Sequence, residues 1–256
     1  MTGPTDIDRS LLIEGLGKGL RVIEAFSVGR ARLTATEVGQ LTSLTRTAAR
    51  RYLVSLVHFG FAESDGKHYW LLPSVMRLGK TYLESARLPR LARPLLKDLC
   101  ERIGETCALS VLQQDEIHVL LQCNPSKRMA IGFPSGTRLP IRAASSGVAI
   151  ASAFSQGDLS DRLGTRESCQ GEIFTQEVAN DFVTAVEDAR RRGYALLDTG
   201  INPGLVEVAI PLHDRAGQCL GALGATLQTC RYPNSSLSES IVAPLRQCGD
   251  LIGELF

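Results

Sequence analysis

The stretch that most constrains the fold runs from residue 33 to residue 57 and reads LTATEVGQLTSLTRTAARRYLVSLV. Its segment Thr34–Glu37 fits a capping box, in which a threonine hydroxyl and a glutamate carboxylate satisfy backbone N–H groups at a helix start. Thr42–Leu44 predicts a tight turn, and Thr45 (or Ser43) is suited to cap the helix that follows. The stretch therefore predicts a short helix, a three-residue turn and a second helix.

The second of these helices combines an apolar stripe with a basic start. Its apolar side chains recur at helical spacing, at Ala49, Tyr52, Leu53, Leu56 and Val57. Arginine forks onto guanine edges or phosphates, and threonine hydroxyls bond phosphate oxygens. The residues of this helix that we expect to contact DNA are Thr45, Arg46, Thr47, Arg50 and Arg51. A solvated face of a helical bundle is the alternative interpretation.

The next segment favours the DNA-binding interpretation. Gly60 ends the helix, and the turn dipeptide Asp65-Gly66 separates two short strand-like segments, Phe61–Ser64 and Lys67–Leu71. With a further helix predicted over residues 17–26, three helices and a hairpin make a winged helix-turn-helix. Lys67, at the hairpin tip, is expected to contact the DNA backbone.

Composition and charge set broader limits. The chain has 256 residues, of which 44% are hydrophobic and 21% charged, as in ordinary globular proteins. Residues 1–80 hold 11 basic and 7 acidic residues, a net charge of +4, and residues 81–256 have a net charge of −3. Without a signal peptide, a long apolar segment or paired cysteines, we expect a cytoplasmic protein with no membrane contact, cofactor or metal.

The rest of the chain predicts a second domain of the α+β class. We expect the winged helix-turn-helix over residues 1–74, a linker helix over 75–89 and the second domain over 90–256. Helices are expected over 146–154, 158–163, 176–192 and 237–255. Six strands with hairpins predict a mainly antiparallel six-stranded sheet, built from Cys107–Leu112, Ile117–Cys123, Arg128–Phe133, Tyr194–Leu197, Glu207–Leu212 and Leu220–Leu227.

Three segments, Leu20–Phe26, Leu33–Val38 and Leu44–Leu53, resemble the IclR family of bacterial transcription regulators. The run LTRTAARR is most similar to the family's Pca/Pob branch, which governs aromatic-acid catabolism, and the resemblance covers residues 14–255. It implies a GAF/PAS-like effector domain, a double-stranded operator DNA as partner and a homodimer or tetramer. It also implies a small carboxylate effector such as protocatechuate, 4-hydroxybenzoate, terephthalate or β-ketoadipate.

A serine-rich helix start is the main clue to a ligand. Ser145, Ser146 and Gly147 open a predicted helix, where free N–H groups and the helix dipole favour a carboxylate. An ordinary serine N-cap is the alternative. The resemblance implies further effector-binding residues, namely Arg128, Met129, Ile131, Leu139, Asp198, Leu205, Glu207, Gly224 and Thr226.

Two positions depart from the family pattern near this site. Val148 stands where a basic residue is common, and Gly204–Glu207 replaces the frequent Gly-Leu-Arg followed by a small residue. Glu207 is therefore expected at or near the ligand, where it would accept from a ring hydroxyl or pair with Arg128.

Two other classes of function stay open: an α+β enzyme that binds a small molecule, and a sensor without sequence-specific DNA binding. The sequence contains no nucleophile-elbow, zinc-protease, phosphate-loop or dinucleotide motif, and its four histidines are scattered. We therefore expect a ligand-responsive regulator rather than an enzyme.

Overall fold

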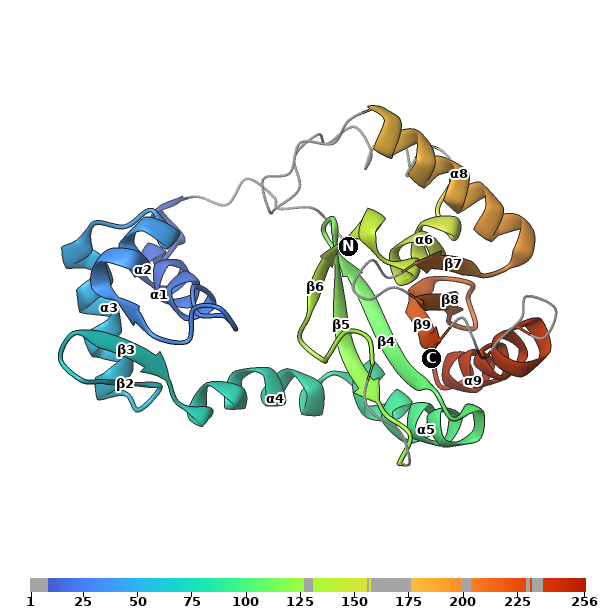
Figure 1. Ribbon diagram of the computed structural model, residues 1–256, viewed down its shortest axis with the longest axis horizontal. Helices are drawn as coiled ribbons and strands as arrows, with labels where there is room; N and C mark the ends of the chain where they lie inside the picture. Colours follow the sequence, from blue (N-terminus) through green and yellow to red (C-terminus); the bar gives the residue numbers. More distant parts are fainter. Residues whose placement is uncertain are drawn as a thin grey trace. The chain divides into compact units, whose positions relative to one another are not determined.

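The computed structural model describes residues 9–126, 131–155, 157, 176–198, 204–228, 231 and 237–256 (Figure 1). Internal contacts divide the chain into two compact units, one that ends at Thr81 and one over Tyr82–Phe256. The expected ends of the DNA-binding domain at residue 74 and of the linker helix at residue 89 remain predictions.

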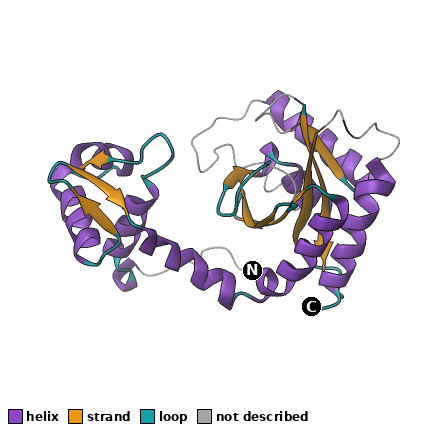
Figure 2. Cartoon of the chain, turned by 60° about the horizontal axis from the view of Figure 1, so that its bottom comes forward, coloured by secondary structure: helices purple, strands orange, loops and turns teal. Residues whose placement is uncertain are grey.

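The first unit is a winged helix-turn-helix, as predicted. After a 3₁₀ turn, Arg9–Leu11, its helices are α1 (Glu14–Glu24), α2 (Ala35–Thr42) and α3 (Arg46–His58). Its antiparallel sheet has the order β1-β3-β2, with β1 at Leu33–Thr34, β2 at Ala62–Ser64 and β3 at His68–Leu71. Figure 2 shows these strands together beside the helices.

The predicted local signals at the helix starts are confirmed. The Thr34 hydroxyl accepts from the Glu37 N–H at 3.3 Å, and the Thr34 N–H donates to the Glu37 carboxylate at 2.7 Å. Thr45, rather than Ser43, caps α3 by accepting from the Ala48 N–H at 3.2 Å. Ser43 instead adopts a left-handed conformation, with φ of 56°, and turns the chain between the helices.

Several boundaries in this unit differ from the predicted ones by one to three residues. Helix α1 begins at Glu14 rather than residue 17, because the glycines at 15, 17 and 19 weaken the sequence signal without ending the helix. Strand β3 begins at His68, so the hairpin turn spans Asp65–His68, and the Asp65 N–H donates to the His68 carbonyl at 3.2 Å.

A helix that buries none of its side chains follows the wing. A 3₁₀ turn, Pro73–Val75, leads into α4 (Met76–Ser85), in which no residue is buried. Its apolar residues Met76, Leu78 and Tyr82 are 76%, 50% and 49% exposed.

The second unit is built on the predicted antiparallel sheet of six strands, in the order β6-β5-β4-β9-β8-β7. The strands are β4 (Thr106–Gln113), β5 (Glu116–Cys123), β6 (Arg138–Pro140), β7 (Ala195–Asp198), β8 (Leu205–His213) and β9 (Cys219–Gln228). This arrangement confirms the α+β fold class.

Helices cover both faces of this sheet (Figure 1). Helix α5 (Arg87–Ile103) and helix α9 (Ala243–Gly253), which follows a π-helical turn at Ser238–Val242, pack on one face. A 3₁₀ turn, Ile141–Ala143, precedes α6 (Ser145–Ser152), and α6 and α8 (Gln176–Arg192) pack on the other face. Because strand side chains alternate, Val208 and Ile210 of β8 face α5 and α9, whereas Ala209 faces α6.

The predicted strand Arg128–Phe133 is wrong over the residues that the structure describes. Residues 127–130 of the expected strand Arg128–Phe133 lie outside the described residues, and residues 131–133 are not in a strand. The edge strand is β6, which pairs with β5. This segment contains Pro134, Gly136 and Pro140, residues that are typical of turns. The sequence pattern therefore does not indicate a short edge strand here. The expected helix over 158–163 lies outside the described residues.

We predict that Gly39→Ala destabilises the first unit. A Cβ at Gly39 would lie 2.8 Å from the Leu44 carbonyl oxygen, so the turn would have to move away from α2. We expect a loss of about 1–3 kcal/mol in the free energy of unfolding, measured by chemical denaturation.

Gly17→Ala is the matched control, since Gly17 lies within α1 and its Cβ would meet nothing within 4 Å. It is expected to raise the stability by about 0.5–1 kcal/mol, because alanine favours a helix. Equal effects of the two substitutions would contradict the proposed clash.

Candidate functional site

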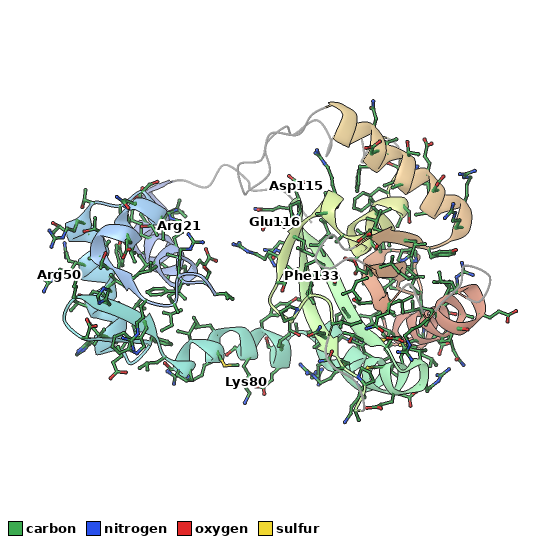
Figure 3. All side chains as sticks on the ribbon, viewed as in Figure 1. Arg21, Arg50, Lys80, Asp115, Glu116 and Phe133 are labelled. Carbon is green, nitrogen blue, oxygen red and sulfur yellow. The ribbon has the colours of Figure 1, made fainter. Side chains whose placement is uncertain are left out.

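The first unit exposes a basic face on α3. Arg46, Thr47, Arg50 and Arg51 are all exposed on the first two turns, and Thr45 stands at the N-cap. Figure 3 shows Arg50 at one edge of the unit, pointing away from its helices. The buried residues of α3, Ala49 and Leu53, lie on its other side. The structure therefore brings the five residues predicted on this helix to one accessible helix start.

The wing holds Lys67 at an ordered tip. The Asp65 carboxylate accepts from the Lys67 N–H at 2.9 Å and from the His68 N–H at 2.7 Å. These backbone hydrogen bonds lower the pKa of Asp65 to about 2, so the carboxylate is ionised at neutral pH. The turn is thereby fixed while the Lys67 side chain stays exposed.

A basic side chain that the sequence did not single out also supports the wing. The Arg32 guanidinium lies 4.3 Å from the centre of the Trp70 ring, whose Nε1 donates to the Glu63 carboxylate at 3.3 Å. Such a contact joins the loop after α1 to the hairpin. Arg32 and Trp70 lie far apart in the sequence, so this contact is non-local and hard to find from the sequence.

In the second unit, strand pairing brings several predicted residues together on the α6-facing side of the sheet. Glu207 of β8 pairs with Thr226 of β9, and Gly224 lies two residues before Thr226. Ser145, at the start of α6, bonds to Glu207. We call Ser145, Glu207, Gly224 and Thr226 the Glu207 cluster. Ser145, Glu207 and Thr226 are buried, as is Ser146, the next residue of α6.

Ser145 binds to two strands at once. Its N–H donates to Glu207 Oε2 at 3.1 Å, and its hydroxyl donates to the Glu207 carbonyl at 2.7 Å. The same hydroxyl accepts from the Leu197 N–H of β7 at 3.0 Å. The N-cap residue is Ala144, without a side-chain cap, so the predicted serine-rich helix start is held by a carboxylate of the protein itself.

Two glycines of the predicted site have tight surroundings. A Cβ at Gly224 would lie 3.1 Å from Glu207 Oε1, so this glycine leaves space for the glutamate carboxylate. A Cβ at Gly147 would lie 1.8 Å from the Ile141 carbonyl oxygen. Gly147 therefore permits the close approach of α6 to the preceding turn.

The segment around Ile131 lies over the same end of the sheet. The Ile131 N–H donates to the Thr106 hydroxyl at 3.4 Å, and its carbonyl accepts from Gln122 Nε2 at 3.1 Å. Thr106 pairs with Thr226. Sequence reasoning missed Thr106 and Gln122, although both are polar residues in otherwise apolar strands.

Other predicted residues lie apart from the Glu207 cluster. Asp198 pairs with Val206, so it projects from the opposite face of the sheet, where it is exposed. Leu139 lies on edge strand β6, with three strands between it and β8. Leu205, two residues before Glu207, is buried. Arg128 and Met129 lie outside the described residues.

A separate groove of about 440 Å³ opens beside α9. Its lining includes His213, Asp214, Arg215, Arg246 and Asp250, and none of the predicted effector residues.

Among the described residues, no group of three or more His, Cys, Asp or Glu side chains is arranged to hold a metal. No described helix is long and apolar enough to span a bilayer.

Comparison with known families identifies both units. A family model described as the IclR helix-turn-helix domain matches residues 15–66. A second model, described as bacterial transcriptional regulator IclR C-terminal, matches residues 80–254. Together they confirm the resemblance that the sequence motifs indicated.

Individual relatives agree with these models. The Pca regulon regulatory protein of Pseudomonas putida is 29% identical over 243 residues, covering 94% of this chain and 84% of that protein. The p-hydroxybenzoate hydroxylase transcriptional activator of Acinetobacter baylyi is 30% identical over 251 residues, covering 95% of this chain and 92% of that protein. The aromatic-catabolism branch is thereby confirmed as the one that this chain resembles.

A solved structure shares the fold over nearly the whole chain. The IclR homologue of Microbacterium hydrocarbonoxydans, crystallised in complex with 4-hydroxybenzoate, matches with a TM-score of 0.71 and 23% identity. The match covers 93% of this chain and 97% of that chain.

We predict that Glu207 makes stability depend on pH. Burial raises the pKa of Glu207 from 4.5 to about 7, so the folded protein holds this proton more tightly than the unfolded chain. Its contribution to the free energy of unfolding therefore falls, by about 3 kcal/mol, as pH rises from below 4.5 to above 7.

Glu207→Gln removes this titration and keeps an oxygen acceptor for the Ser145 N–H. Denaturant unfolding at pH 5 and pH 8 is expected to show a smaller loss of stability for the glutamine variant than for the wild type. Parallel losses in the two proteins would show that Glu207 ionises normally.

Proposed function

This chain belongs to the IclR family of bacterial transcriptional regulators, and we propose that its first unit binds a double-stranded operator while its second unit binds a small aromatic acid. Its relatives bear the names of regulators, and the chain is a regulator rather than an enzyme. The two proposed ligands require different surfaces, and the two units supply them.

The observation that carries the DNA proposal is the exposed basic start of α3. A recognition helix places its first turns against base edges in the major groove. We assign Arg46, Thr47 and Arg50 to groove contacts, Thr45 and Arg51 to the adjacent backbone, and Lys67 of the wing to a flanking phosphate. The helix start and the ordered wing tip support this assignment.

We predict that Arg50→Ala lowers operator affinity by about 5–150-fold, with the largest loss at one operator position. Gel-shift titration on DNA flanking the gene for this protein measures the change. Arg21→Ala is the matched control: Arg21 is exposed on α1, and Figure 3 shows it away from the edge that carries Arg50.

Unchanged binding of every DNA sequence by Arg50→Ala would refute the assignment of this arginine. Absence of sequence-specific binding by the wild-type protein at moderate salt would refute operator binding itself.

The effector proposal rests on the α6-facing side of the six-stranded sheet. Polar groups of the Glu207 cluster lie there beside Leu205 and the segment around Ile131, and we assign Ser146, Gly147, Leu139, Arg128 and Met129 to the same site. Asp198 is left out of this assignment, because it lies on the opposite face of the sheet. An aromatic acid is supported by the name of one relative, an activator for p-hydroxybenzoate hydroxylase, and by the 4-hydroxybenzoate bound to the Microbacterium homologue.

We propose further that the chain forms a homodimer or a tetramer. Two-fold dimers match palindromic half-sites about 34 Å apart. Helix α4 supports the dimer, because it buries none of its own residues and exposes Met76, Leu78 and Tyr82. A second copy would remove this apolar surface from water.

We predict that Met76→Glu weakens the dimer at least tenfold, since a charge would be buried at the interface. Light scattering over micromolar concentrations measures the association. Leu251→Glu is the control, because Leu251 is 43% exposed and belongs to α9 rather than to the helix that carries the proposed surface. A wild-type protein that stays monomeric at these concentrations would overturn the proposal.

A further inference from the structure

Helix α3 carries an apolar side chain, Val54, that its own unit does not bury. Val54 is 46% exposed, whereas Ala49 and Leu53 of the same helix are fully buried. Tyr52 and Leu56 also pack against the core of the first unit, and Val54 is not among the residues of that core. Packing within the unit therefore does not account for a valine at this position.

Local helix preference does not account for it either. The branched Cβ of valine restricts the side chain in a helix, so alanine, arginine, lysine and glutamate all form helices more readily. Position 54 lies inside α3, well away from both of its ends. A residue that lowers local preference and gains no packing in return is typical of a functional position. Val54 is thus expected to contact a group outside the chain.

The position of Val54 on the helix identifies the surface to which it belongs. Thr47, Arg50, Arg51 and Val54 follow the spacing i, i+3, i+4 and i+7, which places them on one face of α3, and all four are exposed. A helix that lies along the major groove contacts bases from side chains at this spacing. Val54 continues the basic start of α3 by one turn, about 6 Å beyond Arg50 along the helix axis.

The charge of this face favours DNA as the group that covers Val54. Helix α3 contains three arginines and no aspartate or glutamate. Within the described part of the chain, no hydrogen bond or ion pair engages the guanidinium groups of Arg46, Arg50 and Arg51. Figure 3 shows Arg50 pointing away from the unit. Phosphates and base edges of a duplex would supply partners for these cations, and Val54 would then face the floor of the same groove.

We propose that Val54 is a specificity-determining residue of the DNA-binding surface, and that its methyl groups pack against the C5-methyl group of a thymine. This methyl is the apolar group that base edges present in the major groove, and apolar side chains recognise it. The inference rests on the proposed operator binding. It places a thymine in each operator half-site about two base pairs from the base that Arg50 contacts.

Replacement of single thymines by deoxyuridine tests this proposal, because it removes only the C5-methyl group and keeps every hydrogen-bonding group of the base. The probe is the DNA fragment flanking the gene for this protein, with one thymine replaced at a time, and affinity is measured by gel-shift titration. For the wild type, we expect a loss of about three- to fivefold at one position of each half-site, the value for one buried methyl group.

Variants of Val54 assign this loss to its side chain. Because Val54→Ala lacks the two methyl groups, it should bind the thymine and deoxyuridine fragments equally, within about 1.5-fold. Val54→Thr keeps one methyl group in nearly the same shape and should retain a preference of about twofold for thymine. Leu20→Ala is the matched control, since Leu20 is 47% exposed on α1, and it should keep the full wild-type preference.

The outcomes separate the two proposals. If the wild type binds no DNA sequence specifically, operator binding fails and this inference fails with it. If the wild type binds specifically but no single deoxyuridine lowers its affinity, only the assignment of Val54 is overturned. The same holds if Val54→Ala keeps the wild-type preference for thymine, or if Leu20→Ala loses it.

Discussion

The α6-facing side of the six-stranded sheet depends on the hydrogen bonds that Ser145 makes to β7 and β8. One residue connects the start of a helix to a side chain, a carbonyl and an N–H of two neighbouring strands. Because Ser145 and Glu207 are buried, loss of either side chain would leave a polar atom unsatisfied, at a cost of about 1–3 kcal/mol. The position of α6 and the orientation of Glu207 are therefore fixed together.

Glycines make this close arrangement possible. Gly147 lets the first turn of α6 approach the Ile141 carbonyl, and Gly224 leaves room for the Glu207 carboxylate. In the sequence, Gly224 indicates space for a ligand or another backbone; in the structure a side chain of the protein occupies part of that space. Small residues in a strand thus mark a close approach without identifying which group makes it.

The sequence allowed the first unit to be predicted almost completely, because its signals are local. The Thr34–Glu37 capping box and the Thr45 cap each act within four residues. Edge strand β6 was missed because prolines and a glycine surround it. The contact between Ser145 and Glu207 spans 62 residues, and only the unusual glutamate in the Gly204–Glu207 motif pointed toward it. Pattern and propensity say little about such distant partners.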